Sequence, residues 1–446
     1  MTPPRRQLGL GIAAAIVVAN MIGTGIFTST GFQAASLHDP ATMLFTWFVG
    51  GVLALCGAAC YAELGSMMPR AGGEYVYLRE AYHPAVGFMS GWVSLTAGFS
   101  APIAAAALAF SKYSGKVIPA LDGKWEGKLV AAGLIVAISS LHAFDTKLGG
   151  RVQTAFTIGK ASLIAVFILA GLLVGDGDWS NLGTVGDGLA QLKTWDGLEA
   201  FATSMMWVSL AYSGWNAAAY IAGEIEHPQR TLPRALLLGT GLVMVLYLLL
   251  NVVFLYSTPP GQMAGVEEVG DLAARNLFGE SFGRVLSTLV ALALVSSVSA
   301  MLMAGPRVYA AMAADRALPR ILATYNERGV PQVAVVTQTV LAIAFVFIGD
   351  LDKLVQFVGF TLSIFAALTV SAVFVFRLRK RTSPYRTWGY PVTPAVFIAL
   401  SLWFVYLRVK GAPKESAIVG VMLVVGAVIY ALTSKGMQHT KIEEDE

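Results

Sequence analysis

The sequence predicts an all-α polytopic membrane protein. Hydrophobic residues make up 56% of the 446 residues and charged residues only 13%, with a mean hydropathy of +0.66. A soluble domain carries about a quarter of its residues as charges. The apolar runs are continuous over about twenty residues, the length of a membrane-crossing helix, whereas strands of an outer-membrane barrel are shorter and alternate. Two of the runs are interrupted near their middle.

Reading the apolar runs between loop signals gives twelve spans. They lie near residues 10–34, 41–65, 84–111, 129–144, 151–174, 197–222, 233–256, 284–313, 331–348, 353–376, 392–409 and 416–433. The fourth span is short for a full crossing. An even number of spans places both termini on one side, and the acidic end of the segment 434–446 is expected to be solvated and disordered.

The placement of basic residues predicts the orientation. Most Lys and Arg fall on the side of the termini, as Arg6, Arg70 and Arg79 do, whereas the outer loops hold acids such as Asp176. Cytoplasmic loops carry the excess of Lys and Arg, so both termini are expected in the cytoplasm. The net charge of +4 therefore reports topology, and no nucleic acid partner is expected. The first span keeps its length and has no small-residue cleavage site, which argues against a signal peptide.

The first interruption is Asn-Met-Ile-Gly-Thr-Gly-Ile-Phe at residues 20–27. Freed backbone groups inside a membrane must line a protein-enclosed cavity or touch a ligand. A half-helix beginning near Gly25 offers N–H groups to a carboxylate, and one ending near Met21 offers carbonyl groups to an ammonium group. An amino acid carries both charges. Close helix packing is the alternative explanation of the glycine pair.

The second interruption is Leu210-Ala211-Tyr212-Ser213-Gly214-Trp215-Asn216, halfway along the sixth span. Spans one and six are five apart, which predicts two copies of a five-helix unit with opposite orientation, whose broken first helices meet at the midplane. The copies would cover residues 10–174 and 197–376. Residues 392–433 would form two further helices outside the repeat, after a cytoplasmic N-terminus of residues 1–9.

These motifs resemble those of the amino acid–polyamine–organocation superfamily, and within it the L-amino acid transporter branch. The resemblance rests on Met-Ile-Gly-Thr-Gly-Ile-Phe at 21–27, Tyr-Ala-Glu-Leu-Gly at 61–65, Pro-Arg-Ala-Gly-Gly-Glu-Tyr at 69–75, Tyr-Ser-Gly-Trp-Asn at 212–216 and the segment 224–233. It implies the LeuT-like fold, with a 5+5 inverted repeat and broken helices 1 and 6, and transport by alternating access in a bacterial inner membrane.

The resemblance also implies a substrate site at the two interruptions. The substrate ammonium group would contact carbonyl groups and the carboxylate would contact N–H groups, and the Thr24 hydroxyl could add a contact. The implied residues are Met21, Ile22, Leu210 and Ser213 for the ammonium group, Thr24 and Gly25 for the carboxylate, and Gly23, Ala211 and Gly214 beside them. The branch often has an aromatic residue at position 210. Trp215 is an alternative lid, or else an interface anchor.

Lys160 lies about nine residues along the fifth span, where a buried ionisable group is expected to be functional. Snorkelling toward the interface is the alternative. In similar transporters this position puts an ammonium group where sodium-coupled relatives hold a sodium ion, between helices one, five and eight. Lys160 is then expected to tie the first half-helix to Ser296, Ser297 or Ser299. A lysine can instead carry a proton.

The remaining signals limit the substrate and the partners. No Asp or Glu lies in the middle of any predicted span, so the substrate side chain is expected to be neutral. Pocket candidates are Ser94, Gly98, Phe357 and Phe360, together with the serines of span eight. Cys56 and Cys60 are expected to be buried packing residues, so no disulfide-linked heavy chain is expected. No metal site, ATP-binding loop, catalytic triad or other cofactor motif is present.

The sequence therefore predicts a sodium-independent secondary exchanger of neutral L-amino acids, surrounded by membrane lipids, and not an enzyme. A proton-coupled amino acid symporter remains an alternative. An amino acid sensor that transports nothing would need an output domain, for which the short tail leaves little room.

Overall fold

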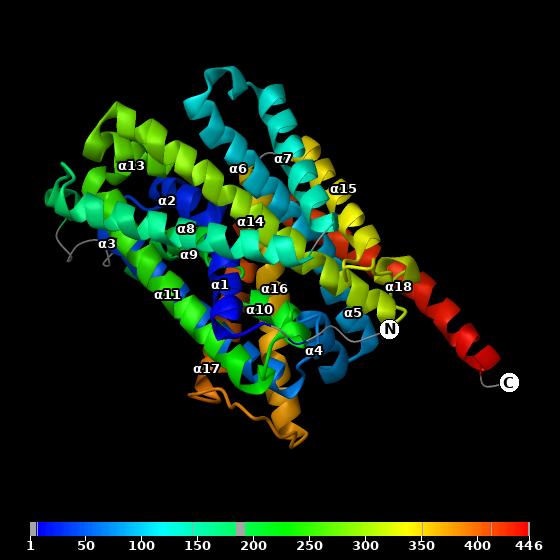
Figure 1. Ribbon diagram of the computed structural model, residues 1–446. Coiled ribbons are helices and arrows are strands. Elements are labelled where there is room, and N and C mark those ends of the chain that lie inside the picture. Colours follow the sequence, from blue (N-terminus) through cyan, green and yellow to red (C-terminus); the bar gives the residue numbers. More distant parts are fainter. Residues whose placement is uncertain are drawn as a thin grey trace.

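The computed structural model describes residues 6, 8–144, 146–183, 192–349, 351–411 and 413–444. Within these ranges the chain forms a bundle of helices, and the only β-type pairing is an isolated bridge between Leu8 and Ile225. Figure 1 shows the helices of the two halves interleaved, with α1 and α2 in the interior.

The bounds of the helices follow the order of the apolar runs. The first half of the chain contributes α1 (Leu10–Met21), α2 (Thr24–Ser36), α3 (Pro40–Met67), α4 (Glu74–Ala81), α5 (Pro84–Val93), the π-helical turn η1 (Ser94–Ser100), α6 (Ala101–Val117), α7 (Lys124–Phe144) and α8 (Thr146–Leu173). The second half contributes α9 (Trp195–Ala211), α10 (Ala217–Tyr220), α11 (Pro228–Ser257), α12 (Pro260–Met263), α13 (Val269–Phe278), α14 (Glu280–Ala314), α15 (Gln332–Ile348), α16 (Leu351–Leu378), α17 (Val392–Gly411) and α18 (Pro413–Glu444).

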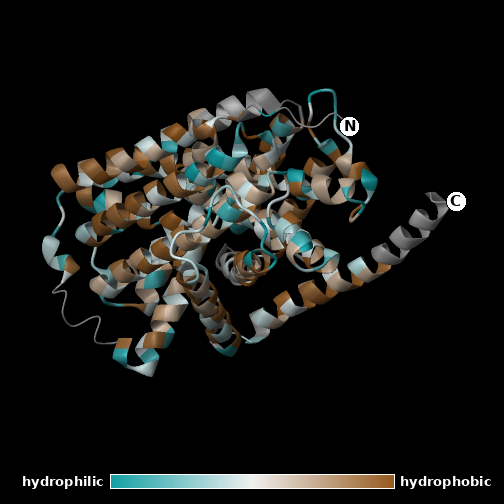
Figure 2. Cartoon of the chain, turned by 90° about the horizontal axis from the view of Figure 1, so that it is seen from below, coloured by the Kyte–Doolittle hydropathy of each residue, from teal (hydrophilic) through white to brown (hydrophobic). Residues whose placement is uncertain are grey.

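The polytopic all-α fold predicted from the sequence is confirmed. Among the described residues, nine helical segments are long and apolar enough to cross a membrane, and Gln332–Ile348 and Ser416–Leu432 are shorter apolar helices. The remaining expected span is the broken α9/α10. Every expected span thus coincides with helix, while the count of twelve crossings stays a prediction. Figure 2 shows hydrophobic residues along the helices and hydrophilic ones mainly in the loops between them.

Two helix boundaries differ from the expectation. The fourth span was expected to begin at residue 129, but α7 begins at Lys124, because its first turn contains Lys124 and Glu126 and is not apolar. The helix is therefore 21 residues long rather than short. At the other end of the chain, α18 continues to Glu444, through the segment expected to be a disordered tail. Glu, Lys and Met are good helix formers, and no proline follows Pro413 to end the helix.

Both predicted interruptions are confirmed as helix breaks. α1 ends at Met21 and α2 begins at Thr24, with Ile22 and Gly23 in extended conformations. α9 ends at Ala211, and a turn over residues 212–216 leads into the short α10. The helices beside the first break pack against the second half of the chain: α1 packs on α11, and α2 packs on α9.

Glycines let the two breaks touch. A Cβ atom on Gly25 would lie 2.3 Å from the Cα atom of Ala211, and a Cβ atom on Gly214 would lie 2.8 Å from the carbonyl carbon of Asn20. Gly214 also has a φ of +93°, which L side chains rarely adopt. Each break therefore carries a glycine where the backbone of the other approaches. Close packing accounts for Gly25 without any ligand.

The end of the bundle that contains Leu8 is held by backbone and ionic contacts. The Leu8 N–H donates to the Glu224 carbonyl oxygen at 3.0 Å, and the Glu226 N–H donates to the Leu8 carbonyl oxygen at 3.0 Å. Arg307 of α14 pairs with Glu224 at 2.5 Å. The chain before α1 is therefore fastened to the segment after α10.

Candidate binding site at the helix breaks

A small cavity lies between the two breaks, and we call it the break cavity. Its lining comes from both breaks, from α6, from α14 and from α16: Asn20, Met21, Gly23, Thr24, Gly25, Pro102, Ala105, Ala106, Leu210, Ser213, Ser297, Met301 and Val358. None of these side chains is charged. The volume of the cavity is about 40 Å³, so it has room for ordered water.

The N-terminus of α2 gives this cavity a site for a carboxylate. Gly23 is the N-cap residue and has no side chain to pair the first N–H groups, and the first turn contains no acidic residue. Gly23, Thr24 and Gly25 all line the cavity. Because the first N–H groups of a helix lack intrahelical partners and carry the positive end of the helix dipole, they favour an anion.

Lys160 of α8 holds the first break. Its side chain is 2% exposed, and Nζ donates to the carbonyl oxygens of Ala19 at 2.7 Å and Ile22 at 2.6 Å and to Ser297 Oγ at 3.2 Å. Snorkelling does not occur, because the ammonium group ends on α1 rather than at the surface. The charge connects α1, α8 and α14.

The three neighbouring serines of α14 have different surroundings. Ser297 Oγ donates to the Ile22 carbonyl oxygen at 3.0 Å, so Ser297 is the serine that joins Lys160 at the break. Ser299 instead bonds to His142 Nε2 of α7 at 2.7 Å and does not line the break cavity. Ser296 is buried and does not line it either. Successive residues on a helix face different sides, which separates three nearby serines.

Tyr247 of α11 connects the two breaks, and sequence analysis did not identify it. Its hydroxyl lies 2.6 Å from the Met21 carbonyl oxygen and 3.2 Å from the Ala211 carbonyl oxygen. These carbonyl groups end α1 and α9. Tyr247 and Asn251 are polar residues one turn apart within a membrane-spanning helix, and that pattern was the available signal.

These donors change the predicted ammonium contacts. A carbonyl oxygen has two lone pairs, and Ile22 already accepts hydrogen bonds from Lys160 and Ser297. An ammonium contact at Ile22 would have to displace one of them. Met21 accepts one side-chain hydrogen bond, from Tyr247, and keeps capacity for another donor, whereas Leu210 accepts from the N–H groups of both Tyr212 and Ser213. Met21 therefore fits a substrate ammonium group better than Ile22 or Leu210 does.

Trp215 does not cover the break cavity in this structure. Its ring packs edge-on against Tyr61 of α3, with centroids 4.7 Å apart, and against Phe397 of α17 at 6.0 Å. The turn at Gly214 sends the next side chain to the other side of the break. Neither the expected lid nor an interface anchor matches this buried position. Leu210, by contrast, lines the break cavity.

A second cavity lies on the other side of the second break, and it contains Glu74. This Glu74 cavity is lined by residues of the turn 212–216 and of α3, α16 and α17, among them Trp215, Asn216 and Ser401. Glu74 is 3% exposed and accepts hydrogen bonds from Tyr61 Oη at 2.6 Å and Asn216 Nδ2 at 2.9 Å. Burial raises the pKa of its carboxyl group.

Glu74 escaped the sequence analysis because it follows a span instead of lying inside one. Gly72 and Gly73 have φ values of +117° and +51°, and they turn the chain back into the bundle. A Cβ atom on Gly73 would lie 2.5 Å from the Tyr220 ring. The Gly-Gly pair before Glu74 was the signal that this carboxylate could be buried.

Other pocket candidates lie outside the break cavity. Neither Ser94 nor Gly98 lines it, and the α6 wall comes instead from Pro102, Ala105 and Ala106, one to two turns further on. On α16, Val358 lines the cavity and Phe357 does not. The side chain of Phe360 lies outside the described residues. The π-helical turn η1 shifts the phase of the helix before α6, which a count at 3.6 residues per turn does not anticipate.

Comparison with known proteins identifies the family. The family model "Amino acid permease" matches residues 8–436. The chain belongs to the amino acid permease family. It is 30% identical over 407 residues to the serine/threonine exchanger SteT of Bacillus subtilis (strain 168), covering 90% of each protein. It is 29% identical over 437 residues to the human b(0,+)-type amino acid transporter 1, covering 96% of this chain and 88% of that protein.

A third relative supports the branch. The chain is 27% identical over 437 residues to the human large neutral amino acids transporter small subunit 2, covering 96% of this chain and 80% of that protein. The resemblance to the L-amino acid transporter branch of the amino acid–polyamine–organocation superfamily is therefore confirmed. The permease is a membrane protein that transports amino acids, and it is not an enzyme.

Proposed function

We propose that this permease is a sodium-independent exchanger of neutral L-amino acids that works by alternating access. The observation that carries the proposal is the position of Lys160. Its ammonium group donates to two carbonyl groups of α1 and to Ser297 of α14. By the resemblance to sodium-coupled relatives, this is where a dissociable sodium ion would connect the same elements. A covalently fixed charge needs no sodium and cannot be driven by a sodium gradient.

The break cavity supports a small, neutral substrate. Its lining offers an uncapped helix N-terminus and carbonyl groups for the two charges of the amino acid backbone. Around the expected side chain it offers alanine, methionine and valine from α6, α14 and α16. A distal cation or anion would find no charged partner there, and burying an unpaired charge is costly. The SteT relative is named as an exchanger of serine and threonine, which are small and neutral.

Exchange is expected if the permease reorients slowly when no amino acid is bound. A ligand shifts a conformational equilibrium only by its difference in affinity for the two states. If neither an ion nor a proton stabilises the occluded state, each reorientation needs an amino acid. We therefore infer that counter-transport is fast and net transport is slow. A proton carried by Lys160 would instead make the permease a symporter.

We also propose that the permease works without a disulfide-linked heavy chain, in a bacterial inner membrane with both termini in the cytoplasm. The chain has two cysteines, Cys56 and Cys60, and both are buried within α3. They are therefore poorly placed to bond a partner. The name of one relative calls it a small subunit, so the heavy chain question is specific to this branch. The orientation rests on the distribution of Lys and Arg.

Uptake into proteoliposomes tests the exchange proposal. Vesicles preloaded with unlabelled L-serine should take up labelled L-serine several times faster than empty vesicles, and sodium should have little effect. An inward proton gradient should not concentrate the substrate in empty vesicles. Concentrative uptake under that gradient would select the symporter. Binding without any uptake would select the sensor.

A further inference from the structure

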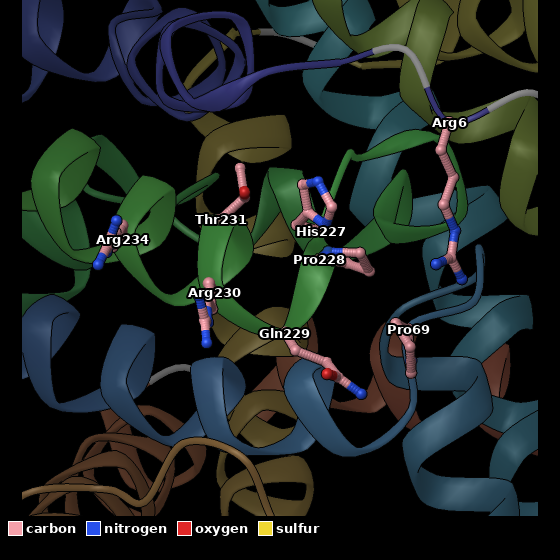
Figure 3. A pocket seen from close by; sticks show the side chains of 8 residues that line it. All are labelled: Arg6, Pro69, His227, Pro228, Gln229, Arg230, Thr231 and Arg234. Carbon is pink, nitrogen blue, oxygen red and sulfur yellow. The ribbon is translucent and has the colours of Figure 1, made fainter.

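A wide, basic cavity opens at the Leu8 end of the bundle, away from the two breaks. The volume of the cavity is about 610 Å³. Its lining, shown in Figure 3, comes from the chain before α1, from the turn after α3 and from the start of α11: Arg6, Pro69, His227, Pro228, Gln229, Arg230, Thr231 and Arg234. We call it the basic cavity.

The arginines of the basic cavity differ from their neighbours in having no acidic partner. Among the described residues, Arg6, Arg230 and Arg234 form no ion pair, and no acidic side chain lines the cavity. Four other arginines on the side of the termini are paired: Arg70 and Arg79 contact Asp315, Arg307 contacts Glu224, and Arg377 contacts Glu63. The positive charge of the basic cavity is therefore not neutralised by the protein.

The backbone adds to this positive charge. α11 is 30 residues long, begins at Pro228 inside the cavity, and has neither a side-chain cap nor an acidic residue in its first turn. The N-terminus of such a helix carries a partial positive charge, although Pro228 has no N–H group and those of Arg230 and Thr231 donate to the His227 carbonyl oxygen. Guanidinium groups bind phosphate oxygens with paired hydrogen bonds. The chemistry of the cavity therefore suits a phosphate group.

The outer face of α11 indicates what carries the phosphate. Arg234 is followed at intervals of three or four residues by Leu238, Leu242, Val245 and Leu249, which are 60%, 50%, 54% and 40% exposed. Residues at this spacing share one helix face. The face is apolar, belongs to a membrane-spanning helix and begins where the arginines end. A ligand that matches both parts has a phosphate head and hydrocarbon tails.

We propose that the basic cavity binds the headgroup of an anionic phospholipid, whose acyl chains lie along the exposed face of α11. The headgroup phosphate contacts Arg230 and Arg234, one turn apart at the start of α11, whereas Arg6 lies at the other end of the cavity in Figure 3 and adds to its positive charge. Arg6 is two residues from Leu8, whose backbone pairs with Glu224 and Glu226. This backbone pairing keeps the charge of Arg6 at the basic cavity.

Native mass spectrometry of the full-length, detergent-purified permease tests this proposal without relying on transport. Phosphatidylglycerol and phosphatidylcholine with the same acyl chains are added separately, and retained lipid is measured at rising collision energy. The wild type should retain phosphatidylglycerol several times better than phosphatidylcholine. The double variant Arg230→Ala/Arg234→Ala should lose this preference, and Arg230→Lys/Arg234→Lys should keep part of it, because lysine retains the charge.

The matched control removes two exposed basic residues elsewhere, in the variant Arg320→Ala/Lys380→Ala. It should retain phosphatidylglycerol as the wild type does. Equal retention by the wild type and the Arg230→Ala/Arg234→Ala variant, both monodisperse, would overturn the proposal. Glycerol phosphate should displace the lipid poorly, because it lacks the chains that contact α11. If it competed as well as phosphatidylglycerol itself, the cavity would bind free phosphate compounds and the lipid assignment would be wrong.

Discussion

The two helix breaks differ in the groups that hydrogen-bond their freed backbone atoms. At the first break, charged and hydroxyl groups from three other helices occupy the freed carbonyl groups: Lys160, Ser297 and Tyr247. At the second break, the turn 212–216 pairs with its own backbone, Tyr247 donates to the Ala211 carbonyl oxygen, and Asn216 donates to Glu74. A buried ammonium group therefore holds the first break, whereas the second depends on Gly214, on local hydrogen bonds and on the Tyr247 hydroxyl that both breaks share.

This difference assigns the breaks different parts in transport. Rearranging a break that is held by a buried ammonium group costs free energy, because a charge or a carbonyl group would be left unpaired. A break held by a turn, one hydroxyl group and one buried carboxyl group can change shape at lower cost, because no ammonium group has to lose its partners. We therefore expect the first break to present the substrate backbone contacts and the second break to move during occlusion.

Gly25→Val should have the largest effect, and it should act on folding. The added Cβ atom would lie 2.3 Å from the backbone of Ala211, which cannot move aside as a side chain can. We expect little monodisperse protein on size-exclusion chromatography. Gly241→Val is the control, because a Cβ atom there meets nothing within 4 Å. Normal yield and elution of Gly25→Val would show that the two breaks are not in contact.

Lys160→Ala should lower exchange by about tenfold or more, because the carbonyl groups of Ala19 and Ile22 would lose their charged donor. Initial exchange rates in proteoliposomes would measure this effect, and sodium should not restore activity. Lys112→Ala is the control, since Lys112 is half exposed and contacts Glu267 at the surface. A Lys160→Ala variant with wild-type exchange would remove the first break from the account.

Tyr247→Phe should have a smaller effect, because the ring remains and only the hydroxyl between Met21 and Ala211 is lost. Leaving these carbonyl groups without that donor costs about 1–3 kcal/mol. We expect a lower melting temperature and a lower exchange rate. Tyr256→Phe, which loses a single bond to Gly175 outside the site, provides the comparison. If both variants lose exchange equally, Tyr247 has no special role at the breaks.

Gly23→Ala should weaken substrate binding without disturbing the fold. A Cβ atom at this position would have its nearest neighbour, Ser297 Oγ, at 3.7 Å, and the backbone there is extended, which alanine adopts freely. The methyl group takes space from the break cavity, at a cost of about 1 kcal/mol for a tightly fitting ligand. Equilibrium binding of labelled L-serine would show this loss. Unchanged affinity would place the substrate elsewhere.

Glu74→Gln should have the smallest effect on exchange. Burial raises the pKa of the Glu74 carboxyl group and so favours its neutral form, and glutamine has a similar shape with an oxygen that can accept from Tyr61 and Asn216. We expect exchange within about twofold of wild type, since few hydrogen bonds are lost. Glu74→Ala should be clearly worse. Equal loss in both variants would show that the ionised carboxylate is required.

The breaks and Lys160 could be predicted from the sequence because their signals are local. Weak helix formers such as Gly23, Gly25 and Gly214 interrupt apolar runs wherever the run is placed, and Lys160 is a charge within an apolar span. The fold class followed in the same way from run length. These features need no knowledge of which helix lies beside which.

The remaining parts of the site depend on helix rotation and long-range packing. Which of the three serines meets Lys160, and that Tyr247 reaches both breaks, depend on the facing sides of α8, α11 and α14. The direction of Trp215 depends on the left-handed Gly214. Glu74 enters the bundle only because two glycines reverse the chain. A single sequence does not specify these relations.

Substrate protection of single cysteines tests most directly whether the break cavity is the amino acid site. In a background with Cys56→Ser and Cys60→Ser, Met301→Cys places a thiol in the break cavity and Ser401→Cys places one in the Glu74 cavity. Maleimide labelling rates are measured with and without saturating L-serine. The account predicts that L-serine slows labelling at position 301 severalfold and leaves position 401 unaffected. Protection at position 401 with none at position 301 would contradict it.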